Sequence, residues 1–204
     1  MVIEKLIAGF KSFKGSYYTG QSELYSSLVE NGQSPDALVI ACSDSRVDPA
    51  IITKAEPGQL FVVRNVANLV APYQSDNPNT GTSAAIEFAV RDLKVGHIII
   101  LGHTHCGGIR RLCNRTGEKE PREFIDSWMS IVENDITFDL QGEELLRNVE
   151  KQVIKISLDN VLSFPWVKSR VDSGMLEIHG WLFDLEAGEI KSYSKNSGWQ
   201  SISQ

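Results

Sequence analysis

The stretch LVIACSDSR, residues 38–46, joins an uninterrupted apolar run to a polar loop. Apolar residues in succession are typical of a strand that is covered on both faces of a parallel sheet. Asp48 and Pro49 follow, and this pair favours a helix start with Asp as the N-cap and Pro as the first helical residue. The segment therefore predicts a buried strand, a loop and a short helix.

The same alternation continues along the chain. Residues 60–63 and 97–101 predict strands, and residues 80–94 predict a helix because their apolar positions recur at spacings of three and four. Further helices are expected from residue 107, over 121–134 and over 142–162, and strands over 176–185 and 189–193 form a hairpin. Alternating strands and helices indicate right-handed crossovers. We therefore predict an α/β fold with a mostly parallel sheet, about four parallel strands plus an antiparallel edge strand, flanked by helices.

One domain is expected over residues 1–204, because no internal repeat or linker divides the chain. Residues 1–34 predict a weakly helical arm, which carries aromatic side chains at positions 10, 13, 17 and 18. Apolar surface of this kind usually marks a site of protein–protein contact. We therefore expect the arm to pack on a partner subunit.

Charge and composition exclude several classes of protein. The net charge is -6, and the absence of a basic cluster in the sequence argues against nucleic-acid binding. The longest apolar stretch is about half of the roughly 20 residues that a membrane span requires, and the first ten residues do not resemble a signal peptide. Three cysteines do not make a disulfide framework, which indicates a reducing compartment. We expect a cytoplasmic protein without nucleic-acid or membrane partners.

A possible metal site follows two of the predicted strands. Cys42 comes directly after the strand 38–41, and His103 and Cys106 come after the strand 97–101. If these strands are parallel neighbours, the three side chains converge at the edge of the sheet where such folds bind ligands. Two thiolates and one imidazole form a zinc site with the fourth position left open for chemistry. We predict one Zn²⁺ per chain on Cys42, His103 and Cys106.

Each of these residues could also have a purely structural role. Cys42 and Cys106 could be inert core residues, as is expected of Cys113, and His103 could be a hydrogen-bonded loop residue. Cys106 is expected where a helix begins, so that the free amides of Gly107 and its neighbour would favour its thiolate and lower its pKa. The coincidence of all three at two strand ends favours the metal site.

The other histidines are weaker candidates for the metal. His105 could replace His103 as a ligand, although its place directly before Cys106 favours a different direction for its side chain. His97 precedes its strand, at the opposite end, and His179 on a late strand is expected to be structural.

Asp44 and Arg46 stand two residues apart in the loop after Cys42, so their side chains lie on one side of an extended chain. An arginine can grip a carboxylate by two parallel hydrogen bonds and keep it ionised. The pair could be an ordinary surface salt bridge, but its place directly after Cys42 favours a role beside the metal. We predict that Arg46 holds Asp44 in the catalytic site, where its carboxylate accepts the proton of a zinc-bound hydroxide.

Five segments together resemble the β-class carbonic anhydrases, in a likeness that runs from about residue 21 to residue 193. They are CSDSR at 42–46, EPG at 56–58, FVVRNVAN at 61–68, AAIE at 84–87 and GHTHCGG at 102–108. The resemblance implies reversible hydration of CO₂ to bicarbonate and a proton, by attack of zinc-bound hydroxide. It also implies a homodimer or a higher homo-oligomer. The motif GQSP at 32–35 is similar to the plant-type branch of this family.

The resemblance implies further residues of the active site. Gln33 matches a glutamine that reaches into the site across the dimer and donates a hydrogen bond to bicarbonate. Phe61 and Val66 match apolar residues that line the CO₂ pocket, to which Phe88 adds a third wall. The amide of Gly107 is expected to meet the growing negative charge of bicarbonate.

Some positions depart from the family. Certain plant enzymes have Tyr at position 88 and His at position 92, where this chain has Phe88 and Asp92, so proton export through them is not expected. A bacterial branch with a regulatory bicarbonate site uses Trp, Arg and Tyr, where this chain has Val39, Arg64 and Phe183. We therefore predict that the regulatory site is missing and that Asp44 stays on Arg46 and off the metal.

Three other functions compete with CO₂ hydration. A hydrolase of carbonyl sulfide or carbon disulfide would use the same water activation on the same scaffold. A structural zinc protein would need a fourth ligand, for which Cys113 is the only spare cysteine nearby. A nucleotide-binding module is disfavoured because the glycine-rich turns match neither the dinucleotide nor the P-loop spacing.

Overall fold

The computed structural model describes residues 1–19, 23–75, 80–114 and 120–202. It separates into two units, Met1–Ser34 and Pro35–Gln204. The first unit holds α1 (Val2–Tyr17) and α2 (Leu24–Asn31), so the N-terminal segment is helical as predicted. Residues 20–22 of the expected arm lie outside the described residues. Packing of the arm on a partner subunit stays a prediction.

Aromatic rings join the two helices of the first unit. The ring of Phe13 lies 5.0 Å from that of Tyr17 and 5.6 Å from that of Tyr25, and Tyr18 stacks on Tyr25 at 4.8 Å. These contacts leave much apolar surface uncovered, since no residue described in α1 or α2 is buried and Phe10 is 61% exposed. The apolar arm that the sequence predicts is therefore present.

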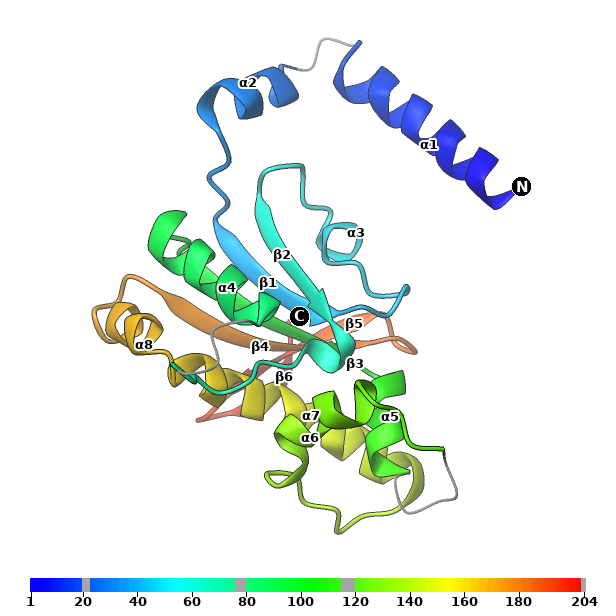
Figure 1. Cartoon of the computed structure of the whole chain (residues 1–204), viewed down its shortest axis with the longest axis vertical. Helices are drawn as coiled ribbons and strands as arrows, with labels where there is room; N and C mark the ends of the chain where they lie inside the picture. Colours follow the sequence, from blue (N-terminus) through cyan, green and yellow to red (C-terminus); the bar gives the residue numbers. More distant parts are fainter. Residues whose placement is uncertain (20–22, 76–79, 115–119, 203–204) are drawn as a thin grey trace. The chain divides into compact units, whose positions relative to one another are not determined.

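The second unit is built on a six-stranded sheet in the order β2-β1-β3-β4-β5-β6 (Figure 1). The strands β1 to β4 are mutually parallel, and β5 and β6 continue the sheet in antiparallel fashion. The bounds are β1 Ala37–Cys42, β2 Leu60–Asn65, β3 His97–His103, β4 Glu177–Asp184, β5 Glu189–Ser194 and β6 Gly198–Ser201. The predicted α/β fold with four parallel strands is confirmed. The antiparallel edge has one strand more than expected. The sequence did not predict β6 because its four residues are too few to give a strand pattern.

Alternate residues of the central strands enter different cores. Leu38 and Ile40 of β1 belong to the larger core, which also contains Ile98 and Ile100 of β3. Val39 and its alternate neighbours lie in a smaller cluster on the opposite face of the sheet. Both faces are therefore covered, which is why β1 is buried along its whole length and its sequence is uninterrupted in apolar character.

The helices of the second unit agree with most of the predicted segments. Asp48 caps α3 by accepting hydrogen bonds from the amides of Ala50 and Ile51, at 3.0 and 3.3 Å. The helices are α3 Pro49–Thr53, α4 Gly81–Glu87, α5 Gly107–Cys113, α6 Ile125–Glu133, α7 Gly142–Leu162 and α8 Pro165–Asp172. A π-helical turn over Phe88–Asp92 extends α4. The short helix α8 was not expected, and it has no clear apolar stripe because only Val167 is buried in it.

Helix α7 packs closely against β3 and β4 (Figure 1). A Cβ atom on Gly102 would lie 2.6 Å from the Cδ1 atom of Ile154, and one on Gly180 would lie 2.8 Å from the Cδ1 atom of Leu158. Only glycine allows the helix to come this near to the strands at both positions. Among the described residues, no helix has the length and apolar character that crossing a membrane would require.

Candidate metal centre

The three predicted metal ligands converge at the carboxyl edge of the parallel strands. Cys42 is the last residue of β1, His103 is the last residue of β3, and Cys106 stands at the N-cap of α5. Because β1 and β3 are paired in parallel, their ends lie side by side. One sulfur or nitrogen atom from each residue lies within 4.8 Å of the corresponding atoms of the other two, and all three residues are buried.

The spacing of the two sulfur atoms suits a shared ion. The Sγ atoms of Cys42 and Cys106 lie 4.0 Å apart. Two Zn–S bonds of about 2.3 Å at a tetrahedral angle span about 3.8 Å, whereas a disulfide joins its sulfurs at about 2.05 Å. The pair therefore has the separation of two thiolates around one zinc ion.

His103 presents an unused nitrogen to this group. Its Nδ1 atom lies 2.8 Å from the backbone oxygen of Thr104, which accepts a hydrogen bond from Nδ1–H. This contact leaves the Nε2 lone pair free, and Nε2 is buried without a hydrogen-bond partner. A buried polar atom without a partner is costly unless something binds it. The donor set of two sulfurs and one imidazole nitrogen therefore fits zinc, with the tautomer that a ligating histidine needs.

Without a metal, the two thiols interact strongly. The hydrogen bond with Cys106 is the main cause that lowers the pKa of Cys42, and the same contact, together with burial, raises the pKa of Cys106. The predicted lowering of the Cys106 pKa is therefore wrong for the metal-free chain. The amide of Gly108 acts in the expected direction, but the adjacent Cys42 sulfur outweighs it.

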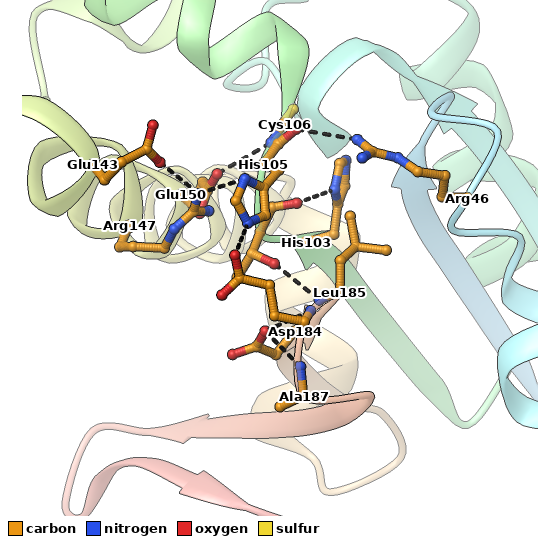
Figure 2. Close-up of polar contacts among 12 residues, drawn as sticks. Arg46, His103, His105, Cys106, Glu143, Arg147, Glu150, Asp184, Leu185 and Ala187 are labelled. Atoms are coloured by element: carbon orange, nitrogen blue, oxygen red, sulfur yellow. Dashed lines mark hydrogen bonds and ion pairs between the residues drawn. The ribbon is translucent and has the colours of Figure 1, made fainter.

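Arg46 grips the carboxylate of Asp44 with a bidentate pair of hydrogen bonds. Nε donates to Oδ1 at 2.9 Å and Nη2 donates to Oδ2 at 2.7 Å, while the Arg46 backbone amide also donates to Oδ1 at 3.0 Å. These hydrogen bonds hold the pKa of Asp44 well below its usual range. Nη2 also donates to the backbone oxygen of His105, and Figure 2 shows Arg46 beside the Cys106 segment. Asp44 is therefore ionised and held by Arg46.

Arg64 of β2 anchors the loop that carries Asp44. Its Nε atom donates to the backbone oxygen of Cys42 at 3.0 Å, and Nη2 donates to that of Asp44 at 2.7 Å. Its Nη1 atom forms an ion pair with Asp48 at 2.9 Å. This arginine is thus engaged by the chain itself, and the absence of a regulatory bicarbonate site stays a prediction.

A polar network behind Cys106 was not predicted from the sequence. The buried carboxylate of Glu150, on α7, accepts a hydrogen bond from the Cys106 amide at 3.1 Å and forms an ion pair with Arg147. Arg147 also contacts Glu143 and the Nδ1 atom of His105, and Figure 2 shows it between these groups. The spacing of Arg147 and Glu150 on one helix is an ordinary surface pattern, so only the packing of α7 on β3 reveals this role.

His105 turns away from the metal ligands. Its φ of 59° places the residue in the left-handed region, and its Nε2 atom lies 2.8 Å from the carboxylate of Glu186. Among the described residues, the ligand group contains only Cys42, His103 and Cys106. Neither His105 nor the half-buried Cys113 therefore joins it, and a structural site closed by a fourth cysteine is not supported.

The predicted substrate residues are not all near the metal group of the same chain. Phe61 pairs with Leu38, four residues before Cys42, which is roughly 13 Å along the strand at about 3.3 Å per residue. Its ring contacts that of Phe88 at 5.8 Å. Val66 lies nearer, because its Cγ1 atom would be 2.6 Å from a Cβ on Gly108.

Two of the predicted substrate residues, Val66 and Gly107, border open space. Val66 lines a groove of about 1080 Å³ together with Trp128, whose Nε1 atom donates to the Val66 oxygen at 2.8 Å. A Cβ on Gly107 would meet nothing within 4 Å, so the start of α5 is accessible. Gln33 is exposed and belongs to the first unit. Its role, like those of Phe61 and Phe88, stays a prediction.

Comparison with known proteins identifies the family. A model of the carbonic anhydrase family matches residues 37–190, a span that includes the ligand group. A carbonic anhydrase of Synechocystis sp. is 36% identical over 197 residues, covering 94% of this chain and 71% of the relative. The chloroplastic β carbonic anhydrase 5 of Arabidopsis thaliana is 37% identical over 194 residues, covering 90% of this chain and 62% of that protein. The chain belongs to the β-class carbonic anhydrases. It is therefore an enzyme of the carbonic anhydrase family.

Solved structures of β-class carbonic anhydrases share its fold. The β-carbonic anhydrase CcaA is 34% identical and superposes with a TM-score of 0.88, covering 99% of this chain and 92% of that chain. One of two tetrameric β-carbonic anhydrases from Sordaria macrospora is 27% identical with a TM-score of 0.79, covering 94% and 96% of the two chains. The predicted family and fold are therefore confirmed.

Proposed function

We propose that this enzyme hydrates CO₂ reversibly to bicarbonate and a proton, with one Zn²⁺ per chain bound by Cys42, His103 and Cys106. The observation that carries the proposal is the buried His103 Nε2 atom without a hydrogen-bond partner, beside two cysteine sulfurs 4.0 Å apart. Zinc bound there would lower the pKa of a coordinated water toward neutrality and so supply the nucleophile. Membership of the β-class carbonic anhydrases supports the reaction.

Asp44 has a specific part in this reaction. As an ionised carboxylate it can only accept hydrogen bonds. The nucleophile must therefore donate its hydrogen bond to Asp44, which leaves a lone pair of its oxygen directed at CO₂. Oδ1 already accepts two hydrogen bonds from Arg46, whereas Oδ2 accepts one from its Nη2 atom. Each carboxylate oxygen has two lone pairs, so Oδ2 retains one for the nucleophile. Arg46 fixes this orientation by its bidentate contact.

The remaining site residues bind CO₂ and bicarbonate. Apolar walls at Val66, Phe61 and Phe88 suit an uncharged substrate, and the roughly 13 Å offset of Phe61 from Cys42 along the strands is consistent with its serving a neighbouring subunit's site. The open approach to Gly107 supports a role for its amide as a donor to the developing negative charge. Gln33 would donate a further hydrogen bond across the subunit interface.

The enzyme is proposed to work as a homo-oligomer, of which a dimer is the smallest form. The exposed apolar side chains of α1 support this proposal, since Ile3, Leu6 and Phe10 are 66%, 65% and 61% exposed. The fold is shared with the tetrameric enzymes of Sordaria macrospora. We place its action in the cytoplasm, on the grounds of its cysteine content alone.

Metal analysis combined with an assay tests this function. The purified enzyme should contain one zinc per chain at its catalytic centre and accelerate CO₂ hydration in stopped-flow measurements. Cys42→Ser should lose the zinc and the activity, whereas the control Cys113→Ser should keep both. A Cys42→Ser variant that binds as many zinc ions per chain as the wild type would contradict the ligand assignment.

The same measurements separate the alternatives. A rate of sulfide release from carbonyl sulfide or carbon disulfide that exceeds the rate of CO₂ hydration would show that the enzyme is a hydrolase of these compounds. Bound zinc without either activity would point to a structural site.

A further inference from the structure

A second group of metal-binding side chains lies at the opposite edge of the parallel sheet. The Nδ1 atom of His97 is 3.2 Å from the Nε2 atom of His179. The carboxylate of Glu177 lies 3.9 Å from the first nitrogen and 3.7 Å from the second. All three atoms are within 4.8 Å of one another. These residues have no part in the proposed CO₂ chemistry, because they begin the strands that end at the catalytic centre.

The fold holds this group together through strand register. His97 is the first residue of β3 and pairs directly with Glu177, the first residue of β4. His179 follows Glu177 by two positions, so both side chains point to the same face of the sheet. The juxtaposition therefore depends on backbone pairing in the sheet, which is rigid, and not on a loop.

The geometry suits a divalent ion with nitrogen ligands. Two Zn–N bonds of about 2.05 Å at a tetrahedral angle span about 3.3 Å, close to the distance between the two imidazole nitrogens. The carboxylate needs only a small side-chain rotation to close the triangle, and Glu177 is free to make it because its side chain is 69% exposed. Two imidazoles and one carboxylate are a common set for zinc and other late first-row metal ions.

The histidines are suited to bind a cation. A neutral imidazole is the form that coordinates a metal. Without a metal, one ring must donate its proton to the other across the 3.2 Å contact, and an ion would replace that proton.

We propose that His97, Glu177 and His179 form a second site for a divalent transition-metal ion, zinc in the first instance. The site would pin the start of β3 to the start of β4 and leave its remaining coordination positions to water. A bound ion would stabilise the folded enzyme as its concentration rises above the dissociation constant. The assignment does not depend on the catalytic role of the first zinc.

Zinc stoichiometry tests the second site. The holoenzyme is dialysed to equilibrium against a series of free Zn²⁺ concentrations, and bound zinc is measured by mass spectrometry. The wild type should bind two ions per chain, and His97→Ala and His179→Ala should bind one. Glu177→Gln should lower the affinity for the second ion by at least about tenfold, because even residues that only support a metal ligand contribute that much. Glu144→Gln, an exposed glutamate on α7, is the matched control and should bind two.

Two further readouts keep the test decisive. In ¹⁵N NMR spectra, the second equivalent of zinc should shift the imidazole nitrogens of His97 and His179, and it should raise the melting temperature of the wild type but not of Glu177→Gln. Retention of the first zinc shows that a variant is folded. A wild type that binds only one ion, or a second ion that persists in both histidine variants, overturns the site. Failure of the catalytic assignment would appear separately, because the first ion would then still bind in Cys42→Ser.

Discussion

The carboxylate of Glu150 on α7 accepts a hydrogen bond from the backbone amide of Cys106, at 3.1 Å and across 44 positions of the sequence. This contact ties the end of a ligand-bearing turn to a helix that packs on the sheet. Arg147, one turn earlier on α7, forms an ion pair with Glu150 and also reaches His105. The helix therefore supports the candidate metal centre from behind.

Removal of the Glu150 carboxylate should destabilise the enzyme. Glu150→Ala leaves the buried Cys106 amide without an acceptor, and we expect a loss of about 1–3 kcal/mol in the free energy of unfolding. Glu150→Gln keeps an acceptor and should lose less. Glu143→Gln removes an exposed partner of the same Arg147 and should cost under about 1 kcal/mol. Urea unfolding of the zinc-loaded proteins measures these differences, and equal losses in the Ala and Gln variants would contradict the role of the Glu150 Oε1 atom as acceptor for the Cys106 amide.

Substitution of Asp44 should reduce turnover while zinc stays bound. In Asp44→Ala no ionised acceptor remains to orient the nucleophile, and the rate constant kcat should fall by roughly 10²-fold or more, in the range of acid–base groups. Asp172→Asn, which removes an exposed carboxylate from an ion pair on α8, should leave kcat unchanged. Full activity in Asp44→Ala would end the proposed role of this residue.

The reactivity of the cysteines should report on the metal. Burial raises the pKa of the Cys113 thiol to about 11. The thiolate is the reactive form, so alkylation of Cys113 by iodoacetamide should accelerate about tenfold per pH unit between pH 7 and 9. In the zinc-loaded enzyme Cys42 and Cys106 should be protected, and a chelator should accelerate the labelling of Cys42 because its thiolate is freed and its pKa is lowered.

Mass spectrometry of alkylated peptides distinguishes the three sites. Equal labelling of Cys42 with and without chelator would show that it is not a ligand. Labelling of Cys113 that is independent of pH over this range would contradict its raised pKa.

Gly102→Ala should disturb both the fold and the metal centre. The added Cβ would lie 2.6 Å from the Cδ1 atom of Ile154, so that the Ile154 side chain or α7 itself must shift. Overpacking of this kind costs about 1–3 kcal/mol, and the strain would be passed to His103, the next residue. Gly81→Ala, with nothing within 4 Å of the new Cβ, should be neutral or slightly stabilising. Thermal unfolding and zinc retention measure the contrast, and identical behaviour of the two variants would refute the close packing.

Several elements were predictable because their causes are local. The apolar run at 38–41, the Asp48-Pro49 helix start and the spacing of apolar residues over 142–162 are each confirmed by β1, α3 and α7. The short elements β6 and α8 were missed, since four and eight residues with few buried positions carry little periodic signal. The direction of the Cys106 pKa was wrong because the helix amides are local, whereas the dominant neighbour, Cys42, comes from another strand.

The amino-acid sequence by itself determined which segments form the parallel strands, which residues are the candidate metal ligands, and to which family the chain is similar. These properties follow from residue type and spacing within short windows. Only the tertiary structure decided that the Cys42 and Cys106 sulfurs lie 4.0 Å apart, that Glu150 supports the Cys106 amide, and that His97 meets His179. Each of these depends on contacts between distant segments, whose register is set by how the whole sheet and α7 pack together.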